Sequence, residues 1–101
     1  MNKEDLEKLS DRSIDRLVAV ASGYGADYIE RNPDNAPNYC EIWSDMGPLI
    51  EGAGISVTYM LHEGWDCHAL IDDGNGHDEK YNTMHENPLR AAAIVYLLMQ
   101  E

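Results

Sequence analysis

Residues 86–100, ENPLRAAAIVYLLMQ, form a stretch in which Arg90 is the only charge after Glu86. Asn87 suits the N-cap position of a helix, because its side-chain oxygen can accept from a free backbone N–H of the first turn. Pro88 suits the first helical position, where its fixed φ already matches a helix and its missing N–H costs nothing. The stretch therefore predicts a C-terminal helix.

A helix that is apolar nearly all the way round must be covered on more than one side. A membrane cannot supply the cover, because a spanning helix needs about 20 apolar residues. Protein must therefore cover the helix. We expect cover from the rest of the chain and also self-association, as a homodimer through this C-terminal helix.

The chain of 101 residues, 44% of them apolar, is long enough for one folded domain. We therefore predict a single domain over 1–101. Residues 1–9 are highly charged, which predicts a frayed or irregular lead-in with Leu6 and Leu9 as possible anchors.

Residues 11–22 predict the first helix. Ser10 suits its N-cap, and Gly23 suits the left-handed position that ends a helix. Between them, apolar residues recur at the spacing of one helical face, namely at Ile14, Leu17, Val18 and Ala21.

The middle of the chain predicts short elements. Residues 27–30 (DYIE) suggest a short strand, and residues 32–38 (NPDNAPN) are rich in turn-forming residues. Residues 39–43 (YCEIW) suggest a returning strand. A short helix over about 45–52 is expected next.

Apolar and polar residues alternate from residue 55 onward, which is typical of half-buried strands. We predict a hairpin with arms at about 55–61 and 65–72. One face of it carries Ile55, Val57, Tyr59, Trp65, Cys67, Ala69 and Ile71. The polar segment 72–84 is expected to be a loop or to hold a short edge strand near 80–82. The fold class is thus α+β, a small antiparallel sheet covered by an N-terminal and a C-terminal helix, with a short middle helix.

The net charge of the chain limits the classes of molecule that it is expected to bind. Seven basic and nineteen acidic residues give 7 − 19 = −12. This field repels nucleic acids and anionic lipids and favours basic protein surfaces, although the same charge also serves solubility alone. We therefore expect no direct nucleic-acid binding and no membrane binding. Cys40 and Cys67 have no CxxC spacing and follow no secretory signal, so we expect reduced thiols in a cytoplasmic protein.

Several short motifs follow one another along nearly the whole chain. They are Leu9-Ser10, Leu17-Val18-Ala19, Ala21-x-Gly23-Tyr24, Trp43, Gly47-Pro48-Leu49-Ile50, Ile55-Ser56, Gly64-Trp65, Ile71-Asp72-Asp73-Gly74 and Asn87-Pro88-Leu89-Arg90-Ala91-Ala92. In this order they resemble the NinX-like family of small proteins encoded by tailed phages and prophages of enteric bacteria. The chain departs from the family pattern in its Pro/Asn-rich segment 32–38 and at Met46.

The resemblance implies a phage accessory protein of the host cytoplasm, and it brings no assigned activity with it.

No residue set in the sequence forms a catalytic or metal-binding signature, so we expect no enzyme activity, no metal and no cofactor. The four histidines lack the spacing of a ligand pair. Residues 72–78 (DDGNGHD) lack the acidic register of a calcium loop and suggest a turn. Cys67 falls on the predicted buried face, which suits a structural thiol better than a nucleophile.

The best candidate for a small-ligand site is the start of the C-terminal helix, where free N–H groups and a positive dipole end meet. Its candidate residues are Asn87, Arg90 and His85, with Trp43 and Trp65 as possible stacking partners. The structural alternative is a capped helix in which Arg90 bridges to an acidic residue of a neighbouring loop.

Two functions follow. The first is a non-enzymatic phage accessory protein that binds and inhibits or modulates a host protein through its acidic surface. This includes an anti-defence role of the anti-CRISPR or nucleic-acid-mimic kind. The alternative is a protein that sequesters a small ligand or nucleotide at the Asn87–Arg90 helix start.

Overall fold

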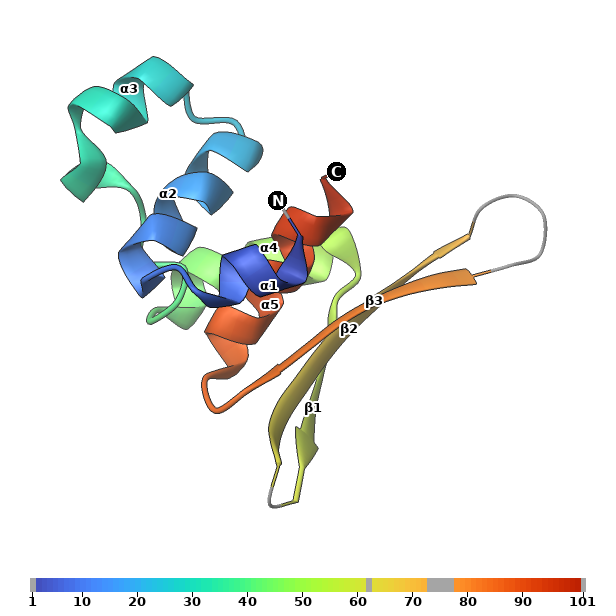
Figure 1. Ribbon diagram of the computed structural model, residues 1–101. Helices are drawn as coiled ribbons and strands as arrows, with labels where there is room; N and C mark the ends of the chain where they lie inside the picture. Colours follow the sequence, from blue (N-terminus) through green and yellow to red (C-terminus); the bar gives the residue numbers. More distant parts are fainter. Residues whose placement is uncertain (1, 62, 73–77, 101) are drawn as a thin grey trace.

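The computed structural model describes residues 2–61, 63–72 and 78–100 (Figure 1). Along the chain lie α1 (Lys3–Glu7), α2 (Asp11–Ala21), α3 (Ala26–Arg31), the 3-10 helix η1 (Pro33–Asn35), α4 (Trp43–Ala53), β1 (Ser56–Met60), β2 (Gly64–Asp72), β3 (Asp78–His85) and α5 (Pro88–Met99).

The helices gather on one side of an antiparallel sheet with strand order β1-β2-β3 (Figure 1). Helix α5 is the central helix, since it contacts β2 and β3 on the sheet side and α1, α2 and α4 on the other. The predicted α+β class, with an N-terminal helix and a C-terminal helix over a central hairpin, is confirmed.

Helix α5 begins and ends where its sequence predicted. The Asn87 side chain accepts from the backbone N–H of Leu89 at 2.9 Å and of Arg90 at 3.4 Å, and Pro88 is the first helical residue. Residues 89–95 are all buried. The single chain therefore already covers most of α5. The predicted homodimer through this helix stays a prediction, with the half-buried Tyr96, Leu98 and Met99 as the residues still available for it.

Helix α2 confirms the predicted first helix. Ser10 Oγ accepts from the Ser13 N–H at 3.2 Å. At the other end, Gly23 has φ +124°, and the Tyr24 N–H donates to the carbonyl of Ala19 at 2.9 Å. This six-to-one bond, made possible by a glycine with positive φ, ends the helix.

Two strand predictions in the middle of the chain are wrong. Residues 27–30 lie in α3, where Ile29 alone is buried. Residues 39–43 form a turn and the start of α4, because the N–H groups of residues 41 and 42 both donate to the carbonyl of Asn38. Consecutive Tyr39 and Cys40 are both buried, which the alternation of a half-buried strand does not allow.

The middle helix is confirmed and is longer than predicted. Helix α4 ends at Ala53 and is capped by Gly54, whose φ of +70° lets the Ile55 N–H donate to the carbonyl of Ile50 at 3.0 Å.

The expectation of a frayed or irregular lead-in over residues 1–9 is wrong. Residues 3–7 form α1, whose N-cap Asn2 accepts from the Asp5 N–H at 2.9 Å. Leu6 is buried in the core and so acts as the anchor that the sequence suggested. A short helix with one buried leucine is stable here because α5 supports it.

The predicted hairpin is confirmed by the register of β1 and β2, which pairs Val57 with Cys67 and Tyr59 with Trp65. Its turn needs Gly64, where φ is +101° and a Cβ atom would lie 2.8 Å from the carbonyl oxygen of His85. The predicted edge strand near 80–82 is β3, which is longer and pairs with β2.

The face predicted to be buried is covered in part, since Ile55 is buried at one end of it and α5 covers part of β2. Cys67 and Ala69 are buried there, together with Thr83 of β3. Tyr59 is exposed, and the side chain of Ile71 lies outside the described part.

Arg12 of α2 holds the loop that leads from α3 to α4. Its guanidinium donates to the carboxylate of the buried Asp15 at 2.9 Å and to the side chain of Asn38 at 2.7 Å. It also lies within hydrogen-bond distance of four loop carbonyls, those of Pro33, Asp34, Ala36 and Pro37. Asp15 in turn accepts from the Cys40 N–H at 2.9 Å, so the loop is fixed at both ends.

We predict that Arg12→Ala lowers the free energy of unfolding by about 2–3 kcal/mol, because it removes the ion-pair partner of the buried Asp15 carboxylate and the hydrogen bonds to several loop carbonyls. Arg12→Lys should recover little, because an ammonium group cannot reproduce the planar fork. Urea unfolding measures both values.

The control is Arg31→Ala, since Arg31 is exposed at the end of α3 and should cost less than about 0.5 kcal/mol. Equal stability of the Arg12 and Arg31 variants would contradict this role of Arg12.

Candidate functional site

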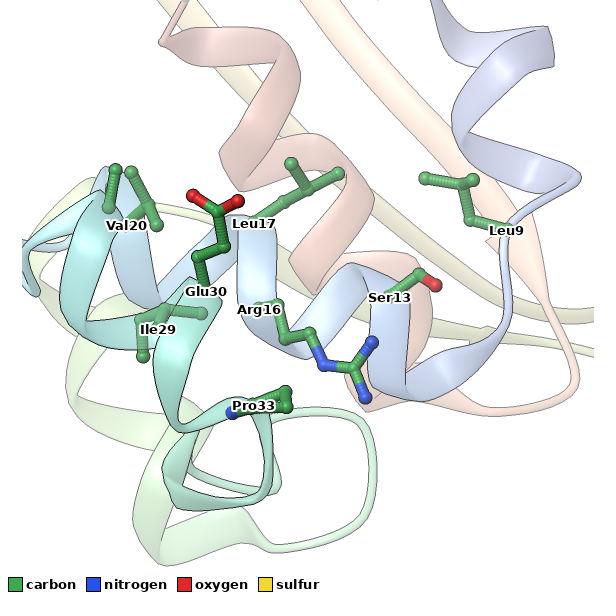
Figure 2. Close-up of a pocket in the computed structure, with 9 residues that line it drawn as sticks. Leu9, Ser13, Arg16, Leu17, Val20, Ile29, Glu30 and Pro33 are labelled. Atoms are coloured by element: carbon green, nitrogen blue, oxygen red, sulfur yellow. The ribbon is translucent and has the colours of Figure 1, made fainter.

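A groove of about 550 Å³ runs between α2 and α3 (Figure 2). Its lining is mostly apolar and comprises Leu9, Ser13, Arg16, Leu17, Val20, Ala26, Ile29, Glu30 and Pro33. A concave surface with apolar walls and few polar groups is the usual setting of a binding site.

The groove exists because α3 turns back beside α2 after the glycine that ends α2. Ile29 is the buried residue of α3, and it packs in the hydrophobic core. Leu17 is only partly buried, and Val20 is 39% exposed, so both offer apolar surface to a partner.

Arg16 is the cation of the groove. Its guanidinium lies between Ser13 and Pro33 in Figure 2. Its Nε atom is buried without a hydrogen-bond partner. Glu30, across the groove, makes no ion pair with it among the described contacts. A guanidinium in such surroundings can donate hydrogen bonds to a carboxylate or phosphate of a partner.

The predicted ligand residues at the start of α5 are bonded within the chain. Arg90 is buried, and its guanidinium donates to Asp11 Oδ1 at 2.7 Å and to the carbonyls of Leu9 at 2.7 Å and Glu7 at 3.0 Å. The side-chain amide of Asn87 donates to the carbonyl of Cys40 at 2.6 Å.

These contacts match the structural alternative, in which Arg90 bridges to an acidic residue nearby. An anion at this helix start would compete with the Asn87 cap for the first N–H groups.

The other three candidate residues are placed differently. His85 Nδ1 accepts from the Asn87 N–H at 2.9 Å, so these two residues do lie together. Trp65 lies opposite His85 in the β2–β3 register, and its ring packs at an angle of 61° against the ring of Tyr59, with 5.2 Å between centroids. Trp43 is the first residue of α4 and is 54% exposed.

Sequence reasoning missed Arg12, Arg16 and the groove. A signal was present, because Arg12, Asp15 and Arg16 recur at helical spacing on the polar side of the predicted helix 11–22. The role of Arg16 in the groove depends on α3, and residues 27–30 of α3 were predicted as a strand. No groove between two helices can follow from that prediction.

A model of the family described as "Bacteriophage P22, NinX" matches residues 5–100. The chain belongs to this NinX family. The match runs from α1 to the end of α5, so it covers the motifs that carried the resemblance. No curated protein and no solved structure matches the chain.

Within residues 2–61, 63–72 and 78–100, no three His, Cys, Asp or Glu side chains are grouped to share a metal ion. None of the described helices combines the length and apolarity that crossing a membrane requires. His62, His77 and residues 73–77 of the predicted turn at 72–78 lie outside the described residues, while Asp72 and Asp78 end β2 and begin β3.

Both cysteines are buried free thiols. Burial, with the Asp66 charge as a smaller cause, raises the pKa of Cys67 to about 12. Burial, followed by the nearby Asp15 carboxylate, also raises the pKa of Cys40 well above its usual range. Since the thiolate is the nucleophilic form, neither cysteine suits nucleophilic catalysis at neutral pH.

We predict that the folded protein resists alkylation by iodoacetamide at pH 8, whereas both cysteines react in urea. Mass spectrometry counts the added groups. Fast labelling of either cysteine without urea would contradict the burial described here.

We also predict that Arg90→Ala lowers the free energy of unfolding by about 2–3 kcal/mol without any ligand, because it removes bonds to Asp11 and to two backbone carbonyls. Asp11→Asn should cost less, since the two carbonyl bonds remain. Thermal unfolding of the purified variants measures this, with the exposed Lys8→Ala as control. An Arg90→Ala protein as stable as that control would show that the arginine is free for another role.

Proposed function

We propose that this NinX-family chain is a non-enzymatic phage accessory protein of the host cytoplasm. In this proposal it binds a host protein with a basic surface and inhibits or modulates it. The observation that carries the proposal is the net charge of −12 on a chain of 101 residues.

The way the fold uses its few cations supports this proposal. In two of the seven basic residues, Arg12 and Arg90, the guanidinium group donates hydrogen bonds within the chain. Most acidic side chains are exposed, among them Glu4, Asp5, Glu7, Asp27, Glu30, Asp34, Glu41, Glu51, Glu63 and Glu86. The surface is therefore strongly negative. Such a surface speeds encounter with basic partners and disfavours acidic ones.

An anti-defence role fits this mechanism. Carboxylates on a small folded protein can occupy the positive channel that a host nuclease or CRISPR complex uses for nucleic acid. The protein would then act as a nucleic-acid mimic without binding nucleic acid itself.

The groove between α2 and α3 offers the apolar anchor that such an interface needs. Charged contacts at the rim of an interface mainly set its association rate, whereas apolar side chains in a concave centre supply most of its affinity. Around this groove lie the exposed acidic residues Asp27 and Glu30 of α3 and Asp34 of η1. A host segment with apolar and basic side chains would fit both features.

The alternative is sequestration of a small ligand or nucleotide at the Asn87–Arg90 helix start. We rank it second because the polar groups there are bonded within the chain. A thermal-shift panel of nucleotides tests it. A nucleotide that raises the melting temperature of the wild type would favour it over host-protein binding.

We predict that immobilised protein captures a host protein from lysate at about 50 mM salt and loses most of it at about 500 mM, since ionic screening shortens the range of charge attraction. Asp27→Lys combined with Asp34→Lys should weaken capture, whereas Glu51→Lys combined with Glu63→Lys tests the same charge change away from the groove. Mass spectrometry identifies the partner.

The groove is tested with a matched pair. Val20→Asp places a charge in the groove, and Ile42→Asp places one at a site of nearly equal exposure outside it, the two side chains being 39% and 41% exposed. The first variant should lose the partner and the second should keep it. No partner at low salt, or equal loss in both variants, would count against this interface.

A further inference from the structure

Strand β1 is an edge of the sheet, because it pairs with β2 on one side and has no strand on the other among the described residues. Half of its backbone N–H and C=O groups therefore point away from the sheet. Proteins usually protect such an edge with charged side chains, proline, a bulge or a covering element.

The segment that holds β1 lacks the usual sequence protections. Residues 52–61, GAGISVTYML, contain no charged residue and no proline, in a chain of which 26% is charged. The other edge strand, β3, has a different sequence, with Asp78, Glu79 and Lys80 at its start. The missing protection is thus confined to one edge.

The same segment exposes apolar side chains. Tyr59 is 58% exposed and Leu61 is 71% exposed, and Met60 between them is 38% exposed. The Tyr59 ring packs against Trp65 of β2, which extends the apolar surface onto the neighbouring strand. Three consecutive exposed apolar residues at an open edge indicate an interface more than chance exposure does.

We propose that β1 pairs antiparallel with β1 of a second copy of this chain, around a two-fold axis at Thr58. In this register Thr58 faces Thr58 of the second copy, and Val57 faces Tyr59. A cross-strand pair of a β-branched and an aromatic residue is favourable, and the two sheets join into one. The proposal is independent of the host-binding function.

Charge favours a second copy over a basic host segment as the occupant. A basic segment is attracted to carboxylates, and the edge has none. Two copies with −12 each repel one another over most of their surfaces, so they can approach best where the surface is neutral. The backbone edge is also self-complementary, as an isologous contact requires.

This pairing and the host complex respond to salt in opposite ways. Screening weakens attraction between an acidic protein and a basic partner, whereas it weakens repulsion between two acidic copies. We therefore expect the dimer to gain affinity from about 50 to about 500 mM salt, the range over which capture of the host protein should fall. A failure to dimerise would not affect capture of the host protein, and a failure of capture would not affect the dimer. The two proposals can therefore be refuted separately.

The test is the oligomeric state of the full chain by sedimentation equilibrium, from about 5 to about 500 µM, because a two-strand contact lies at the small end of specific interfaces. Thr58→Lys and Thr58→Glu should each raise the dimer dissociation constant at least about tenfold, since like charges would face each other across the axis. An equimolar mixture of the two variants should recover the dimer, because a lysine then faces a glutamate.

Thr58 is exposed, so both variants should fold, and circular dichroism checks this. Ser44→Lys and Ser44→Glu carry the same changes at an exposed site on α4 and should stay dimeric. In addition, Thr58→Cys should be joined to a second copy by a short bis-maleimide crosslinker, to which each of the two thiols adds, whereas Ser44→Cys should not. The native cysteines do not interfere, because both are buried.

A wild-type chain that stays monomeric at every concentration and salt level would overturn the proposal. A dimer that survives both Thr58 variants would overturn it as well, and would direct attention to Tyr96 and Met99 at the end of α5. Failure of the lysine–glutamate mixture to recover the dimer would exclude the two-fold axis at Thr58.

Discussion

Burial of α5 is the constraint on which the rest of this structure depends. A helix with apolar residues around nearly its whole circumference is stable in water only if every side of it is covered. The sheet covers one side, while α1, α2 and α4 cover the others. The three alanines 91–93 leave little side-chain volume, so the surrounding elements can lie close to the α5 backbone. The other helices and the sheet thus pack around α5.

Two buried or half-buried arginines hold the enclosing segments in place. Arg90 extends from α5 to the carbonyls of the α1–α2 connection and to Asp11, while Arg12 holds the loop before α4. Each replaces many backbone–water hydrogen bonds with charge-assisted ones. The loops so fixed contain little regular structure, and the guanidinium groups satisfy carbonyls that a helix or sheet would otherwise satisfy. A side effect is that the outer surface has fewer cations.

The surface features of the NinX-family chain separate into three kinds. Exposed carboxylates spread over α1, α3 and α4 set the field around the molecule. The groove between α2 and α3 supplies concave apolar surface with one guanidinium. The neutral edge of β1 supplies backbone donors and acceptors. These act through different interactions, namely long-range charge, apolar contact and directional hydrogen bonds, so the host partner and the second copy that we propose would use different surfaces.

The sequence alone determined the elements whose ends have local chemical signals. Asn87 and Pro88 set the start of α5, Ser10 and Gly23 set the ends of α2, and alternation set the β1–β2 hairpin, because caps, positive φ and strand period act within a few residues.

Tertiary structure decided the rest. Residues 27–30 lie in a helix that packs against α2, and residues 39–43 begin in a turn that Asp15 of α2 holds through the Cys40 N–H. Only the docking of α1 on α5 orders residues 3–7. Arg90 at a helix start looks the same in sequence whether it binds a ligand or bridges to Asp11. The choice depends on carbonyls some 80 residues away in the chain, at Glu7 and Leu9, with sequence separations of 83 and 81. Local sequence carries no information on such long-range contacts, which is why the motifs could be predicted and the site could not.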